Sequence, residues 1–438
     1  MNKLSPITAY YIRNGFDAFN SGLIYTAQFV YYARTLALTP LQLAFIGTLH
    51  MLTHVLLEVP TGIVADVYGR KVSVVLGGLF IGICFVLTGS IPLYAIALMA
   101  TVIEATGDTF VSGALDAWLT DEVGVDKIGA VILRSEQLGM PWHWAGVASS
   151  VLLATLFNIR VPIVLGGASW LVATLALIAL MPETGFVRRV AIPNTALSLL
   201  SLRSSWQHMT SAFGDGARVV RKNRTLWMLF VAQLFIGAFM GSFFGLDQLH
   251  LFTSFTLPGL TLPWIGALNA NAWIAIVDGV KSPLYFLGVT ALRRKIDLSD
   301  VKGAARPLLA LFSMVGGVAV LFALAPGFGI AASALCVMGA IYNLTEPLLR
   351  TWLNQHITSD VRATVLSMST QVNRLGMLGG GLAIGALGNL VGLRVALSVA
   401  VLLLLPLLVL LRQEARTSQQ VVIPSECEES LERLTNKS

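Results

Sequence analysis

The chain has 438 residues, of which 55% are apolar and 12% are charged, and its mean hydropathy is +0.76. Soluble domains carry about 25% charged residues, so this composition excludes a soluble protein and indicates a polytopic membrane protein. The net charge of +6 arises from basic residues in loops between apolar segments, so we expect no nucleic-acid partner.

Twelve apolar segments are long enough to cross a membrane. A helix of roughly 20 residues spans a hydrocarbon core of about 30 Å and satisfies its own backbone hydrogen bonds there. We therefore predict an all-α protein with twelve transmembrane helices. The segments centre near Leu23, Leu52, Phe80, Thr106, Gly146, Trp170, Ala238, Ala275, Val315, Cys336, Met377 and Leu402.

Hydropathy falls between Pro182 and Arg224, with six segments on either side. We predict an N-terminal six-helix bundle over 1–182, a linker over 183–225, a C-terminal six-helix bundle over 226–412 and a disordered tail over 413–438. The apolar residues of the linker have helical spacing, which predicts an amphipathic helix that lies on the membrane face or packs against the bundle ends. Ala117-Trp118-Leu119 recurs as Thr351-Trp352-Leu353, which supports an internal repeat of the two halves.

The basic residues fix the expected orientation, because Lys and Arg in short loops favour the cytoplasm. With the N-terminus inside, only Arg34, Arg160 and Arg394 fall in outer loops. We expect a multi-pass protein of the plasma (inner) membrane with both termini cytoplasmic.

The first predicted helix carries a polar stripe at intervals of three or four residues. The stripe consists of Asn14, Asp17, Ser21, Tyr25 and Gln28. A charged residue at a helix centre costs roughly 2.5 to 3.5 kcal/mol, so such a stripe should face protein or water. We expect it to line a central cavity; the alternative is hydrogen bonding between helices.

The second predicted helix carries His50, His54 and Glu58 at intervals of four residues. This spacing is compatible with metal binding, but histidines at this spacing often make hydrogen bonds between helices. We therefore predict no metal site and no cofactor. The chain contains no catalytic motif that we can identify, so we do not expect an enzyme.

The segment from Gly62 to Val74, GIVADVYGRKVSV, follows the second helix and places an acid, two glycines and an Arg-Lys pair in a short loop. It resembles the loop signature of the major facilitator superfamily, in which the second and third helices of secondary transporters are joined. The matching positions are Gly62, Asp66, Gly69, Arg70 and Lys71. The resemblance implies two six-helix bundles that alternate access to a solute, and a charge cluster of Asp66 and Arg70 with an acid at the end of helix four, for which Asp121 fits. In the family such a cluster holds the outward-open state.

The fourth predicted helix carries Glu104, Asp108 and Ser112 on one face. Two close carboxyls in a membrane favour retention of a proton on one of them, as a proton-coupled carrier needs. The alternative is that these acids pair with Arg134 or His143 on helix five and only orient the helices.

The second half offers two expected ion pairs, Asp278 with Lys281 and Glu346 with Arg350, which would neutralise their own charges along their helices. Asn343 and Arg374 are further candidates for solute contact. Direct solute contact by the paired residues is the alternative that we weigh less.

These residues predict a secondary transporter for a small organic molecule, with proton-coupled efflux of drug-like or amphipathic compounds as the preferred assignment. Gly139, Pro141 and Gly146 match part of the exporter signature of helix five. Uptake of a polar metabolite and a non-transporting receptor or scaffold are the alternatives. The expected partners are a small-molecule substrate, protons and the lipid bilayer, and we expect a monomer.

Overall fold

The computed structural model describes residues 4–185, 214, 217–243, 245–259, 261–262, 266–267, 269–295, 304–357 and 362–416. These residues are almost entirely helical, apart from one antiparallel pair of two-residue strands, β1 (Thr261–Leu262) and β2 (Gly266–Ala267). Most of the predicted linker helix and of the predicted C-terminal tail lies outside the described residues.

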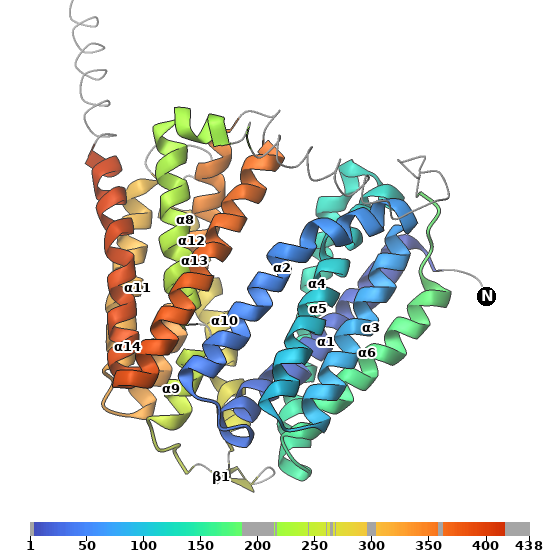
Figure 1. Ribbon diagram of the computed structural model, residues 1–438, viewed down its shortest axis with the longest axis horizontal. Helices are drawn as coiled ribbons and strands as arrows, with labels where there is room; N and C mark the ends of the chain where they lie inside the picture. Colours follow the sequence, from blue (N-terminus) through green and yellow to red (C-terminus); the bar gives the residue numbers. More distant parts are fainter. Residues whose placement is uncertain are drawn as a thin grey trace, which may run out of the picture. The chain divides into compact units, whose positions relative to one another are not determined.

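The chain divides into two compact units (Figure 1), the first formed by Met1–Met209 with Phe244–Ile276 and the second by Thr210–Phe243 with Val277–Ser438. The helices of the first unit are α1 (Pro6–Val30) with the π-helix η1 (Tyr31–Thr35), α2 (Pro40–Tyr68), α3 (Arg70–Ser90), α4 (Tyr94–Val123), α5 (Val125–Leu156), α6 (Arg160–Leu180) and the short α9 (Leu246–Thr253). The helices of the second unit are α8 (Arg224–Phe243), α11 (Ala305–Ala323), α12 (Phe328–Gln355), α13 (Arg362–Val391) and α14 (Leu393–Ala400) with the 3₁₀ helix η2 (Val401–Leu404). Helix α10 (Ala270–Lys295) contributes its first seven residues to the first unit and the rest to the second.

Among the described residues, nine helical segments have the length and hydropathy of a membrane span. The long helices outside this set are α1, α5 and α10. All three carry several charged or polar residues, so their mean hydropathy is lower although their lengths are sufficient. The part of the chain that the structure describes therefore has the predicted all-α membrane fold, and it contains twelve long helices when Leu393–Arg416 is counted as one span.

Helix starts in the first unit follow from local capping residues. Ser5 accepts a hydrogen bond from the backbone N–H of Thr8 at 3.2 Å and so caps α1. Thr39 and Gln42 form a reciprocal capping box at the start of α2, each side chain bonding the other's backbone N–H. Gly69 separates α2 from α3 with a φ of +118°, a conformation that disfavours any side chain, which explains the glycine at this place. The predicted short loop over residues 62–74 was wrong, because α2 continues to Tyr68 and α3 begins at Arg70.

Helices α1 and α5 approach so closely that their backbones touch. A Cβ atom added to Gly22 would lie 2.2 Å from the carbonyl oxygen of His143, and one added to Gly146 would lie 2.0 Å from the carbonyl oxygen of Phe19. Small residues permit this approach, as in other membrane helix pairs. The same device joins α8 and α13 in the second unit, where a Cβ on Gly237 would lie 2.0 Å from the carbonyl oxygen of Asn373.

Candidate functional site

The first unit contains a cavity of about 360 Å³ between α1, α2 and α4. Its volume lies within the range of roughly 300 to 1,000 Å³ that small-molecule sites occupy. The wall is largely apolar with a few polar groups. Its residues are Tyr25, Gln28, Phe29, Tyr32, Leu43, Ile46, Gly47, His50, Met51, Thr101, Glu104 and Asp108.

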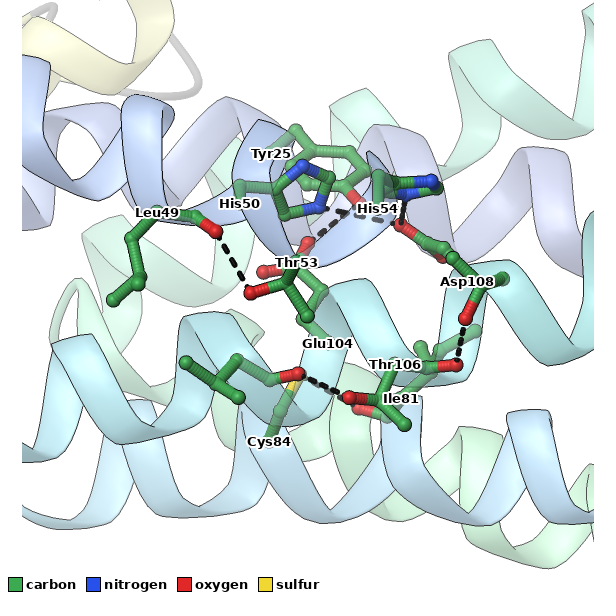
Figure 2. A network of polar contacts seen from close by, with 12 residues as sticks. Tyr25, Leu49, His50, Thr53, His54, Ile81, Cys84, Glu104, Thr106 and Asp108 are labelled. Carbon is green, nitrogen blue, oxygen red and sulfur yellow. Dashed lines mark hydrogen bonds and ion pairs between the residues drawn. The ribbon is translucent and has the colours of Figure 1, made fainter. Parts of the chain in front are cut away.

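Glu104 is the most buried acid on this cavity, with 8% of its surface exposed. The hydroxyl of Tyr25 donates a hydrogen bond to Oε1 of Glu104 at 3.0 Å (Figure 2). This bond joins α1 to α4 and turns the carboxyl toward the cavity. Burial of a carboxyl is costly unless its oxygens are hydrogen-bonded, and the hydroxyl of Tyr25 supplies such a bond to Oε1.

A second polar group consists of His50, His54 and Asp108, of which His50 and Asp108 line the same cavity. The Nε2 atoms of His50 and His54 lie 3.4 and 3.7 Å from Oδ2 of Asp108, and all three side chains are partly buried (Figure 2). The two imidazoles come from successive turns of α2 and their ring centres are 5.0 Å apart. Asp108 is one turn beyond Glu104 on α4, so the two acids predicted to share a face do share it, each with its own partner.

The structure does not support the alternative in which these acids pair with Arg134 or His143. Arg134 donates instead to Oε1 of Gln137 at 3.2 Å, and the ring of His143 packs edge-on against Trp144. Helix α4 packs chiefly against α2 and α3 rather than against α5, which is next in the chain. The acids therefore meet residues from α1 and α2.

The polar stripe of α1 divides between two environments. Tyr25 and Gln28 line the cavity, whereas Asn14 and Asp17 are not among its lining residues. Asp17 lies 3.6 Å from the guanidinium of the buried Arg13. The same guanidinium lies over the ring of Trp170, with its Cζ 5.9 Å from the ring centre. Asn14 lies beside Gly139 of α5.

The loop signature forms a charge cluster at one end of the first unit. Arg70 contacts Oδ1 of Asp66 at 2.7 Å and Oδ2 of Asp121 at 3.7 Å, so one guanidinium faces acids from α2 and α4. Gly62 faces open space on α2, because no described residue outside its own helix backbone and chain neighbours lies within 4 Å of the position that a Cβ would occupy.

Lys71 and its neighbours tie this cluster to the end of α6. The ammonium of Lys71 donates to the carbonyl oxygens of Ile178 and Met181 at 2.7 and 2.9 Å, and its backbone N–H donates to Glu183 at 2.9 Å. The two basic residues of the signature therefore make different contacts. Arg70 contacts acids, and Lys71 caps a helix whose terminal carbonyls carry partial negative charge.

The second unit has a separate cavity of about 530 Å³ between α8, α12 and α13. The predicted ion pairs are confirmed, with Glu346 and Arg350 at 2.6 Å on its wall and Asp278 and Lys281 at 2.8 Å on α10. Neither Asn343 nor Arg374 belongs to this wall. The polar residues that line it are Gln233, Tyr342, Thr345, Glu346, Arg350, Asn354, Ser367, Ser369, Thr370 and Asn373.

Sequence patterns alone leave some of these functional candidates unidentified. Tyr32 follows Gln28 by four residues and receives a hydrogen bond from it at 2.9 Å, so continuation of the α1 stripe by one turn would have found it. The spacing of His50 and His54 is visible in the sequence, but their partner Asp108 lies on another helix and no spacing along the chain reveals that contact.

Known proteins resemble this chain in sequence and in fold. A family model described as the Major Facilitator Superfamily matches residues 14–381. An uncharacterized MFS-type transporter of Bacillus subtilis (strain 168), YxaM, is 23% identical over 374 residues, which cover 84% of this chain and 86% of that protein.

Three solved transporters share the fold at low identity. The nucleoside transporter NupG superposes with a TM-score of 0.68 at 13% identity, and the match covers 95% of this chain and 99% of the NupG chain. A bacterial homologue of the human lysosomal transporter Spinster, in an inward-facing and unoccupied conformation, gives 0.68 at 14% identity, over 94% and 97% of the two chains. The POT family transporter PepTSo gives 0.67 at 12% identity, over 96% and 99%. The family model covers most of the chain, and the fold is shared with solved transporters, so this chain belongs to the major facilitator superfamily and is a membrane transporter of that family.

Proposed function

We propose that this protein exports a small organic solute by alternating access and that protons drive the transport. The observation that carries the proposal is the buried carboxyl of Glu104, held by Tyr25 at the wall of a cavity large enough for a small molecule. A buried carboxyl that opens onto such a cavity can take up a proton there and release it when the opening of the cavity changes. Because an unneutralised buried charge costs several kcal/mol, proton occupancy and conformation are linked.

The largely apolar wall of this cavity favours an amphipathic or drug-like solute. Phe29, Leu43, Ile46 and Met51 supply apolar surface, while His50 and Glu104 supply polar groups that would orient the solute. Export is the direction that we propose, on the partial match of α5 to the exporter signature. We further propose a monomer in the plasma (inner) membrane, with both termini cytoplasmic and the cluster of Asp66, Arg70 and Asp121 acting as a gate.

Uptake of a polar metabolite is the second candidate, and the polar cavity of the second unit favours it. Charged and amide side chains such as Glu346, Arg350 and Asn373 line that cavity and would suit a hydrophilic solute. NupG, a nucleoside transporter of the same fold, provides a polar probe for this reading.

Proteoliposomes with an imposed pH gradient test the proposal, with ethidium as the amphipathic probe and uridine as the polar probe. We expect accumulation of ethidium that a protonophore abolishes. Glu104→Gln should retain exchange of ethidium down its gradient and lose proton-driven accumulation. Glu136→Gln, the same substitution at an exposed position of α5, is the matched control and should accumulate ethidium normally.

Three outcomes would contradict the proposal. Accumulation by Glu104→Gln at the wild-type level would remove Glu104 from coupling. Proton-driven accumulation of uridine without any movement of ethidium would favour the second candidate, and a protein that moves neither probe would favour a receptor or scaffold.

A further inference from the structure

The side chains of His50, His54 and Asp108 bring two nitrogen donors and one oxygen donor together inside the first unit. His50 and His54 are four residues apart on α2, so both imidazoles leave the same face of that helix. Asp108 comes from α4 and presents Oδ2 to both rings. One ligand atom from each of the three residues lies within 4.8 Å of the other two.

These separations are close to those of a metal centre. In a tetrahedral zinc site with bonds of about 2.0 to 2.1 Å, neighbouring ligand atoms lie roughly 3.3 to 3.4 Å apart. The distances from Asp108 to His50 and His54, 3.4 and 3.7 Å, already match this value to within a few tenths of an ångström. Small changes in the side-chain torsions of the two histidines would bring their ring nitrogens to the same separation from each other.

The spacing on α2 is one that metal proteins use. Two histidines at positions i and i+4 of a helix bind zinc in metalloproteases, because the two rings then point at one ion. Here the third donor is supplied by a different helix, which would join α2 to α4 through the metal. Two imidazoles and one carboxylate favour zinc and similar transition metals, whereas Ca²⁺ and Mg²⁺ are bound mainly by oxygen atoms.

The charge of the surroundings suits a dication. Asp108 and Glu104 both line the cavity, and its lining residues include neither lysine nor arginine in the part of the chain that the structure describes. Three protein ligands would leave one coordination position directed at the cavity, where water or a solute could bind. This open position distinguishes the arrangement from a closed structural zinc site.

We propose that His50, His54 and Asp108 bind one divalent transition-metal ion, with Zn²⁺ as the best fit, on the wall of the cavity in the first unit. This site is independent of the proposed direction of transport and of proton coupling. Metal binding is therefore measured directly, without any transport assay.

The test uses the full-length protein with its affinity tag removed and with Cys427→Ser as background, so that neither a tag nor a tail thiol binds zinc. Equilibrium dialysis against Zn²⁺ followed by metal analysis should give one zinc ion per chain. Replacement of zinc by Co²⁺ should give the strong visible absorption of tetrahedral or five-coordinate cobalt with nitrogen and oxygen ligands.

Variants identify the ligands. His54→Ala and Asp108→Asn should each weaken zinc binding by more than about 100-fold, because loss of an outer-shell partner alone already costs roughly 10- to 100-fold. His54→Gln keeps a side-chain donor for Asp108 and serves as a variant that preserves the contact between α2 and α4. His356→Ala is the matched control, since His356 lies on the second unit and bonds the carbonyl oxygen of Trp352 at 2.9 Å.

Wild-type protein that binds no zinc, or an affinity unchanged in His54→Gln and Asp108→Asn, would overturn the proposal. The three side chains would then act as hydrogen-bonding partners that join α2 and α4. Loss of binding in these variants, with an unchanged elution profile in size-exclusion chromatography and full binding by His356→Ala, would support it.

Discussion

The contact of α1 with α5 leads to a stability prediction whose size follows from the structure. Replacement of Gly146 by Ala places a methyl group 2.0 Å from the carbonyl oxygen of Phe19, and replacement of Gly22 by Ala places one 2.2 Å from that of His143. Contacts below 3.0 Å are essentially never made by real Cβ atoms. The helices must therefore move apart by about 1 Å, since a backbone oxygen cannot rotate away as a side chain can.

Two effects of opposite sign determine the outcome. Alanine favours a helix over glycine by roughly 1 kcal/mol, while overpacking of a tight contact costs about 1 to 3 kcal/mol and occasionally more. Because the obstacle is backbone on both sides, we expect an overpacking cost of about 2 to 3 kcal/mol, the upper part of its range. The helix preference of alanine offsets roughly 1 kcal/mol of this cost, so each variant should lose about 1 to 2 kcal/mol of the free energy of unfolding.

The double variant provides the sharper measurement. One separation of the two helices relieves both clashes, so Gly22→Ala with Gly146→Ala should cost less than the sum of the single variants. Residues in direct contact couple by about 0.5 to 3 kcal/mol in such cycles. Unfolding in mixed micelles, followed by circular dichroism, gives the four free energies that the cycle needs.

Gly113→Ala is the matched control, because among the described residues no neighbour outside the backbone of α4 lies within 4 Å of a Cβ added to this glycine. At this position only the higher helix propensity of alanine over glycine acts, so Gly113→Ala should be as stable as the wild type or more stable by roughly 0.5 to 1 kcal/mol. If Gly146→Ala were as stable as Gly113→Ala, or if the two α1–α5 substitutions were additive, the inferred backbone contact would be wrong.

The remaining predictions concern charged groups. Lys281→Ala leaves Asp278 without its ion-pair partner, but Asp278 is partly exposed, so the loss of stability should be smaller than the roughly 3 to 5 kcal/mol of a fully buried pair. Adding Asp278→Asn should recover part of this loss. A double variant less stable than Lys281→Ala would contradict the prediction. Arg70→Lys should keep the unfolding midpoint of the protein but lower its ethidium flux, because an ammonium cannot contact Asp66 and Asp121 together as a guanidinium does. Flux at the wild-type level would show that this dual contact is not needed in the transport cycle.

The sequence predicted the helices well because membrane spans are encoded locally. Runs of apolar residues in α3 and α6 are sufficient on their own, since lipid imposes one length and one secondary structure. The contacts of Glu346 with Arg350 and of Asp278 with Lys281 were also predictable, because both lie within one or two turns of a single helix.

The contacts between helices were harder to predict. Contact of Glu104 and Asp108 with α5, which follows α4 in the chain, was the alternative that the sequence left open. The packing of α4 brings these acids instead to Tyr25 and to the two histidines of α2. Periodicity gives the face on which a residue lies but not the helix that this face meets. The arrangement of Asp66, Arg70 and Asp121 was placed only through the resemblance to the family.

The segment that follows α6 is fixed at several points before the linker continues. The indole of Trp118 donates to the carbonyl oxygen of Pro182 at 2.8 Å, and the carboxylate of Glu122 accepts from the backbone N–H groups of Thr184 and Gly185. Residues up to Gly185 thus belong physically to the first unit. A protein expressed as two separate halves should reassemble when the break follows Gly185, whereas a break directly after Leu180 would strip the N-terminal half of these attachments.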